Sequence, residues 1–241
     1  MNFAQVKGIT IPEGSAKLLV SGLTTLWRKS AVGASDLIVP VYNGVYPTYN
    51  DVARGFPWIV PSGYKRLTGI NFDGNVWYNT GMRLYGSDTL RFSFQVTKAC
   101  NVLGCYTTTS AQTNYSLYCS TTSGSKYLRY NGGTYDSYIA TNTRYDVTIT
   151  PTGSSGMRTD STWTAKTFTT ESDMLIGTTS IGATSAKLTG KMFGDIEVEG
   201  RAYFVPYEKE SDNSIVYINV MTGDVYTNQG SGTPTKIAYY E

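Results

Sequence analysis

Histidine is absent from this chain of 241 residues, and charged side chains make up only 16% of it. Without histidine, Ser-His-Asp and Cys-His catalysis, histidine-ligated zinc and the most common acid–base side chain near neutral pH are all excluded. The chain has 20 Lys and Arg against 18 Asp and Glu, a formal net charge of +2. This balance is atypical of proteins that bind nucleic acid or a membrane surface through charge. The composition therefore disfavours an enzyme and predicts no nucleic-acid partner.

Cysteines and long apolar runs are also scarce. Cys100, Cys105 and Cys119 lack metal-ligand spacing. A bridge between Cys100 and Cys105 is one alternative, but free thiols are the expected state in a protein made in the cytosol. No window approaches about 18 consecutive apolar residues, which predicts no membrane insertion. The start of the chain lacks the features of a signal peptide, so we expect synthesis in the cytoplasm and any extracellular role through assembly into a particle.

Strand-forming residues are abundant, including 20 tyrosines, and 25 glycines provide frequent turns. Apolar and polar residues alternate in 90–96, 145–149 and 216–220, the period expected of strands with one buried face. Short clusters such as Asn131-Gly132-Gly133 separate these runs and are typical of turns. No helical period is sustained over three turns. The sequence predicts an all-β chain with the strand spacing of a sandwich or barrel.

Three zones follow from the distribution of turns and prolines. Residues 1–29 contain a hairpin signal, in which 17–20 and 23–28 flank a Ser-Gly turn. Residues 30–62 hold four of the eight prolines and are interpreted as a connecting arm, because proline cannot donate to a strand ladder. The apolar content of this arm indicates that it packs against something and is not a free linker. Residues 63–241 are interpreted as the main β domain.

Both ends of this main domain resemble a known family. The matching segments are 64–67 (Tyr-Lys-Arg-Leu), 74–82 (Gly-Asn-Val-Trp-Tyr-Asn-Thr-Gly-Met), 191–199, 203–206, 215–220 and 226–232. They are similar to the opening and closing strands of concanavalin A-like (laminin G-like) jelly-roll domains in bacteriophage and prophage tail proteins. The resemblance covers residues 63 to about 235. It implies a jelly-roll sandwich of two antiparallel sheets whose concave face or rim loops often bind carbohydrate.

The first zone resembles N-terminal segments of the same tail proteins, in which an Ile-x-Ile-Pro-x-Gly stretch (9–14) precedes a hairpin ending in Leu26-Trp27. The resemblance implies an attachment segment and a place in the virion, in a tail, baseplate or fibre. The implied partners are host cell-surface carbohydrate or other virion tail proteins. Because about 60 residues bury little core alone and yet include Trp27, Phe56 and Trp58, we also expect a homo-oligomer, with a trimer favoured.

Carboxylates occur at alternate positions in Asp195-Ile196-Glu197-Val198-Glu199. Strand geometry places neighbouring carboxylates about 6.5 Å apart on one face, near the roughly 5–5.5 Å separation of retaining glycosidases. A glycan hydrolase is therefore the alternative function. The interpretation we favour is a strand with a solvated acidic face and with Ile196 and Val198 inside, so no catalytic residue is assigned.

A cluster of tyrosines among Ser, Thr, Asn and Gly is the best candidate for a ligand site. Tyrosine rings stack on the apolar face of a sugar while hydroxyl and amide groups bond its hydroxyls. The alternative is that these rings fill the core. The candidate ligand-binding residues are Tyr118, Tyr127, Tyr130, Asn131, Tyr135 and Tyr138.

Oxygen-rich turns raise the question of calcium, which relatives of the fold carry at the sandwich rim. The candidates are Asp73/Asn75, Asp136 and Asp212/Asn213. None has the spacing of a dedicated calcium loop, and such residues are usual in turns. We therefore predict no metal and no cofactor. The remaining alternative is a purely architectural baseplate or decoration subunit.

Overall fold

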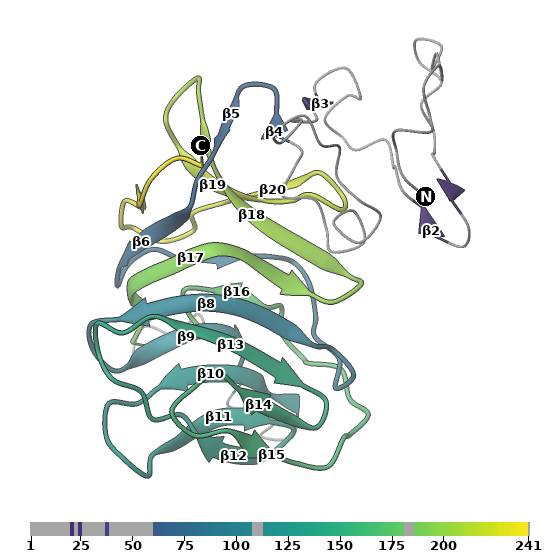
Figure 1. Ribbon diagram of the computed structural model, residues 1–241, viewed down its shortest axis with the longest axis vertical. Helices are drawn as coiled ribbons and strands as arrows, with labels where there is room; N and C mark the ends of the chain where they lie inside the picture. The colour runs from purple at the N-terminus through teal and green to yellow at the C-terminus, as the bar shows by residue number, and fades with distance from the viewer. Residues whose placement is uncertain are drawn as a thin grey trace.

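The computed structural model describes residues 60–107, 113–180 and 186–240, together with the backbone of β1 (Val20–Ser21), β2 (Thr24–Thr25) and β3 (Leu37–Ile38). Within these residues the regular elements are all β-strands and their ladders are antiparallel (Figure 1). The predicted all-β class is confirmed. In the first zone β1 pairs with β2, whereas the other residues of the predicted hairpin and most of the arm lie outside the described part of the chain.

One sheet has six strands in the order β12-β11-β10-β9-β16-β7. Its strands are β7 (Tyr78–Asn79), β9 (Cys100–Cys105), β10 (Tyr115–Cys119), β11 (Lys126–Tyr130), β12 (Gly133–Asp136) and β16 (Leu175–Ile176). Strands β9 through β12 follow one another in the sequence, and each pairs with the next in antiparallel orientation, so the sheet is built mostly from consecutive strands.

The other sheet has eleven strands, of which eight follow the path β15-β14-β13-β8-β17-β18-β19-β20 and three are attached at its side. The path strands are β8 (Leu90–Val96), β13 (Tyr145–Thr150), β14 (Gly153–Ser155), β15 (Ser161–Thr162), β17 (Thr189–Val198), β18 (Ala202–Lys209), β19 (Ile215–Asn219) and β20 (Asp224–Thr227). The attached strands are β5 (Tyr64–Arg66), β6 (Gly69–Asp73) and β21 (Thr235–Lys236). Separately, β3 pairs with β4 (Val60–Pro61).

The hydrophobic core lies between the two sheets, which makes the architecture a β-sandwich. Residues 90, 92, 94 and 96 of β8 and residues 145, 147 and 149 of β13 are buried in one cluster with residues of β9, β10 and β11. The alternate residues of β8 and β13 point away from that cluster, as the period-2 patterns predicted. Both sheets thus contribute one apolar face to a common core.

Strand β17 changes neighbours halfway along its length. Its first half pairs with β6 and its second half pairs with β18, while β8 lines its other edge throughout. Gly194 sits at the change with a φ of 59°, and the register against β8 shifts between Phe193 and Glu197. A positive φ is favourable for glycine because it has no Cβ. This bulge creates a fork in the sheet beside Asp195.

Strand β19 is buried on both faces. Ile215 and Tyr217 face the core between the sheets, whereas Val216 and Ile218 belong to a separate cluster on the opposite, outer face. The alternating run predicted at 216–220 therefore lies in a strand. Its residues Val216 and Ile218, however, face away from the main core and contribute to a second apolar cluster on the outer face.

Candidate functional site

Asp195 is not a solvated carboxylate, which corrects the expectation for the acidic strand face. Its side chain is 12% exposed and pairs at 2.7 Å with Arg66, whose side chain is 8% exposed. Burial raises the pKa of Asp195, and the opposing effects of Arg66 and the Tyr203 hydroxyl do not fully offset it. Asp195 faces Arg66 because the fork in β17 brings β5 close to this position.

Glu197 and Glu199 share a single arginine on the neighbouring strand. Arg91 on β8 donates one guanidinium nitrogen to Glu197 at 3.1 Å and the other to Glu199 at 3.0 Å. Ile196 and Val198, which alternate with these carboxylates along β17, are buried in the main core, as expected. All three acids of the 195–199 string are therefore bound to arginines, which is an arrangement that stabilises a sheet.

Tyr130 belongs to the core, which corrects its assignment as a ligand-binding residue. It is 1% exposed, and its ring stacks on Trp163 with the centroids 5.0 Å apart. Its hydroxyl donates to the carbonyl of Gly86 at 2.7 Å and accepts from the amide of Lys166 at 3.2 Å. A ring so enclosed has no face left for a ligand. Tyr135 is half-buried against the same Trp163, with the two ring centroids 4.5 Å apart.

Tyr118 and Tyr127 lie together on the outer face of the six-stranded sheet. Their ring centroids are 4.8 Å apart in an edge-to-face contact, and Tyr127 is 40% exposed. The adjacent pair Leu117 and Leu128 points into the core, so alternation turns the two tyrosines outward. The structure thus brings together two of the predicted site residues.

The same outer face continues toward Arg129, which is two residues from Tyr127. The Arg129 guanidinium lies 4.0 Å from the centroid of the Tyr106 ring. Arg129 pairs in register with Ser116, which shares its face. We call the surface formed by Tyr106, Tyr118, Tyr127 and Arg129 the tyrosine face. Arg129 carries its only charge.

The last two predicted site residues lie elsewhere. Tyr138 lies in the connection from β12 to β13, which links the two sheets. The guanidinium of Arg158 is 4.7 Å from the centroid of its ring. Asn131 and Gly132 connect β11 to β12 with φ values of 45° and 80°. Positive φ at both central residues is the requirement of a type I′ hairpin, which Asn-Gly meets best. Asn131 therefore has a conformational role that explains its presence without a ligand.

The oxygen-rich turns considered for calcium use their carboxylates on their own backbone. Asp73 accepts from the amide of Asn75 at 2.7 Å, Asp136 from the amide of Tyr138 at 2.8 Å, and Asp212 from the amide of Ser214 at 2.9 Å. These are Asx turns, in which the side chain bonds the amide two residues ahead. The interpretation of these acids as turn residues is confirmed.

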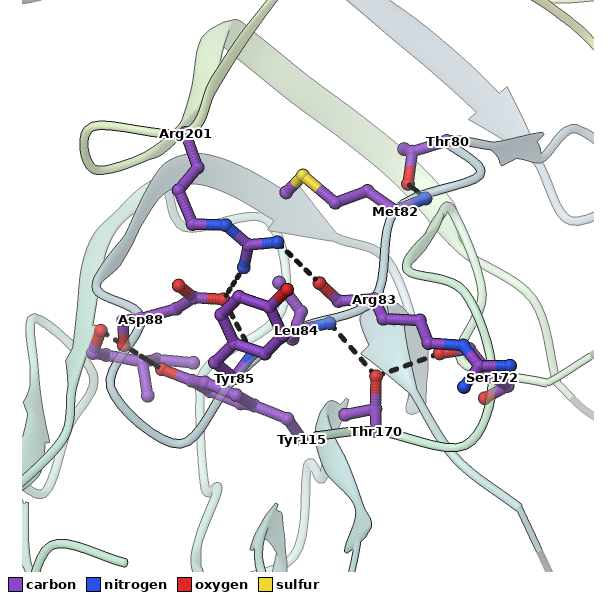
Figure 2. Close-up of polar contacts among 11 residues, drawn as sticks. Thr80, Met82, Arg83, Leu84, Tyr85, Asp88, Tyr115, Thr170, Ser172 and Arg201 are labelled. Atoms are coloured by element: carbon purple, nitrogen blue, oxygen red, sulfur yellow. Dashed lines mark hydrogen bonds and ion pairs between the residues drawn. The ribbon is translucent and has the colours of Figure 1, made fainter. Parts of the chain in front are cut away.

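A second exposed aromatic site occurs at one end of the sandwich, in the loop between β7 and β8 (Figure 2). The ring of Tyr85 is 42% exposed and lies under the guanidinium of Arg201, 3.9 Å from its centroid. Arg201 forms an ion pair with the buried Asp88 and donates to the carbonyl of Arg83 at 3.1 Å. Asp88 also accepts from the amide of Tyr85 at 2.7 Å. The ion pair thus fixes the loop that presents Tyr85.

Sequence reasoning missed this end site. Asp88 and Arg201 are 113 positions apart in the chain and both lie in connections without periodicity. Burial raises the pKa of Asp88 more than the Tyr85 amide and Arg201 lower it. A lone Tyr or Asp in a loop has no sequence signal for such a contact.

Replacing Arg201 by methionine should destabilise this loop. The variant leaves Asp88 buried with the Tyr85 amide as its remaining donor in this loop, so we expect a loss of about 1–3 kcal/mol in the free energy of unfolding. Urea unfolding gives the value, and hydrogen exchange should localise the loss to residues 83–88. Unchanged exchange in that loop would contradict the assigned role of the ion pair.

Within the described residues there is no group of three or more acidic or cysteine side chains placed to hold a metal ion. The same part of the chain contains no helix that is long and apolar enough to span a bilayer. In comparisons with family models, curated proteins and solved structures, nothing matches this chain.

Proposed function

We propose that this chain is a structural and adhesion protein of a bacteriophage or prophage tail, with a concanavalin A-like jelly roll as its C-terminal domain. The sandwich of two antiparallel sheets supports this proposal. Contacts between the opening and closing segments that carry the resemblance also support it. The amide of Leu67 donates to the carbonyl of Pro206 at 2.9 Å, and the amide of Gln229 donates to the carbonyl of Trp77 at 2.8 Å.

The tyrosine face is the proposed ligand surface, and the exposed contact between Tyr118 and Tyr127 is the observation that carries this proposal. Two rings held edge to face on a sheet give a rigid aromatic surface, and each ring carries a hydroxyl group. Such a surface can stack on a sugar ring and bond its hydroxyls. Because Arg129 is the only charge there, binding should depend little on salt.

Binding to a glycan is expected to weaken about tenfold in Tyr127→Ala, since one stacking ring is worth about 1.4 kcal/mol. The free energy of unfolding should change by no more than about 0.5 kcal/mol, because Tyr127 is half-exposed. A glycan array followed by titration with isolated bacterial cell-wall polysaccharide, at low and high salt, measures the effect.

Tyr240→Ala is the matched control, because Tyr240 is also exposed but lies near the other sheet, at the C-terminal end. It should bind like the parent protein. If Tyr118→Ala and Tyr127→Ala fold normally and also bind like the parent protein, the ligand surface lies elsewhere. The chain would then be better described as an architectural baseplate or decoration subunit.

The wider setting of the proposal is the virion. Synthesis in the host cytoplasm, assembly into a homo-oligomer such as a trimer, and contact with host carbohydrate or other tail proteins all belong to it. Repetition of a weak site in an oligomer would raise avidity. No specific observation favours the glycan hydrolase alternative, because the carboxylates of 195–199 are held by Arg66 and Arg91.

A further inference from the structure

Two of the three cysteines, all of which are free and buried, face each other across a pair of strands. Cys100 is the first residue of β9 and Cys119 is the last residue of β10, and the two are direct register partners in this antiparallel ladder. The side chains of direct partners project to the same face of a sheet. Both cysteines belong to the main core, so both sulfurs lie on the inner face of the six-stranded sheet.

The backbone around this pair indicates a Cα separation that suits a disulfide. The neighbouring amides of Asn101 and Ser120 donate to carbonyls outside the β9–β10 ladder, at 2.8 Å and 3.2 Å. Because backbone direction alternates along a strand, Cys100 and Cys119 turn their own amides and carbonyls toward each other. Opposed residues of this kind have Cα atoms about 5.5 Å apart, and disulfides usually span about 4.4–6.8 Å between Cα atoms.

The place of the pair in the ladder allows the small movement that a bridge requires. The Cβ atoms of opposed residues are roughly 5 Å apart, whereas those of a disulfide are roughly 4 Å apart. The pair ends the β9–β10 ladder, and the register shifts close to it, between Leu117 and Tyr118. Such an irregularity interrupts the pairing and lets the strand bend. The two strands can therefore approach each other at this point without disturbing a long regular ladder.

The third cysteine is out of reach of the other two. Cys105 ends β9, five positions after Cys100, and a strand rises about 3.3 Å per residue, so about 16 Å separates their Cα atoms. The register partner of Cys105 is Tyr115, four positions from Cys119, which gives about 13 Å. Cα atoms more than about 7 Å apart are not bridged without backbone movement. The bridge between Cys100 and Cys105 that the sequence left open is therefore excluded.

We propose that Cys100 and Cys119 form a latent cross-strand disulfide, which stays reduced in a reducing compartment and is closed by a disulfide oxidant such as oxidised glutathione. One cysteine thiolate attacks the oxidant and releases a glutathione thiolate, and the other cysteine then displaces the second glutathione. The two protein thiols give up two protons and two electrons and form one S–S bond. The S–S bond of the oxidant is cleaved to two glutathione thiols. The bridge fastens the end of the β9–β10 ladder, whatever ligand the tyrosine face takes.

Burial makes closure slow once the protein has folded. It raises the pKa of Cys100 to about 11 and holds the pKa of Cys119 well above the ordinary value of a thiol. The thiolate is the form that attacks a disulfide, and at neutral pH it is rare for both residues. An experiment on this pair must therefore include refolding, during which both thiols are accessible.

A glutathione titration of the full chain tests the pairing. The protein is unfolded in urea and refolded at about pH 8 with increasing ratios of oxidised to reduced glutathione. The remaining thiols are alkylated, and mass spectrometry of the digest should find Cys100 joined to Cys119 and Cys105 alkylated. Because the fold holds the two sulfurs close, the formation constant of the bridge should be at least about tenfold larger in the folded protein than in urea.

Three results of this titration would overturn the proposal. The first is a formation constant that is no larger in the folded protein than in urea. The second is a glutathione adduct at equilibrium in place of the bridge. The third is a bridge that includes Cys105 or joins two chains.

Thermal melting provides a second measurement with a matched control. The oxidised protein should melt about 5–10 °C above the reduced protein, because the bridge restricts the unfolded chain. Cys105→Ala should keep this difference, since Cys105 is similarly buried but lies out of reach of a second thiol. Cys119→Ala should lose the difference between its two forms, whatever the stability of the variant itself. An oxidised parent protein that melts at or below the reduced one would contradict the proposal.

Discussion

Replacing Arg66 by methionine is expected to lower the free energy of unfolding by about 3–5 kcal/mol at neutral pH. The variant leaves the Asp195 carboxylate, only 12% exposed, without the guanidinium that pairs with it. The energetic cost comes mainly from a buried charge that has lost its compensation. Urea unfolding of the two proteins gives the difference directly.

The pH dependence identifies Asp195 as the cause. The pKa of Asp195 is raised by burial in the folded protein, and removal of Arg66 raises it further, so the folded state binds this proton more tightly than the unfolded state. Stability must then rise as the pH falls through the raised folded pKa toward the unfolded pKa of an aspartate, about 3.9. We expect the deficit of Arg66→Met to shrink as the pH is lowered from neutral toward that value.

Two further variants complete this experiment. Arg66→Met combined with Asp195→Leu should recover most of the lost stability, because no uncompensated charge remains. Arg91→Met is the control for an exposed arginine, with a side chain that is 44% exposed, and should cost less than about 1 kcal/mol. A deficit in Arg66→Met that is independent of pH would contradict the role given to Asp195.

Tyr130→Ala should cost about 3–5 kcal/mol of stability, whereas Tyr127→Ala, three residues earlier, should cost no more than about 0.5 kcal/mol. The ring of Tyr130 packs among Tyr115, Trp163 and Phe168 at one end of the sandwich. Its removal leaves a cavity and frees the backbone groups that its hydroxyl binds. Chemical denaturation of both variants measures the contrast.

Tyr130→Phe separates the two contributions. It keeps the ring and removes the hydroxyl, so the loss should fall to about 1–3 kcal/mol. If Tyr130→Ala were as stable as the parent protein but failed to bind cell-wall polysaccharide, Tyr130 would be a ligand contact, as the sequence had suggested. The tyrosine face requires that result of Tyr127→Ala instead: stability close to that of the parent protein and weaker binding to cell-wall polysaccharide.

Part of this distinction could have been read from the sequence. Along Lys126-Tyr127-Leu128-Arg129-Tyr130, Tyr130 shares a face with Leu128, and Tyr127 shares a face with Arg129. Strand periodicity alone places the first pair inside and the second outside. The same alternation that predicts the buried faces of 90–96 and 145–149 therefore divides the tyrosines of this strand between the core and the surface.

The sequence by itself determined the local features of this protein: an all-β chain, the buried faces of β8 and β13, and the Asn131-Gly132 turn. These follow from side-chain alternation and backbone preferences over a few residues. Only the tertiary structure decided which charges are buried. Asp195 meets Arg66 across 129 positions because a bulge at Gly194 changes the neighbour of β17. Solvation of a side chain depends on what distant segments place around it, and a local pattern carries no record of those segments.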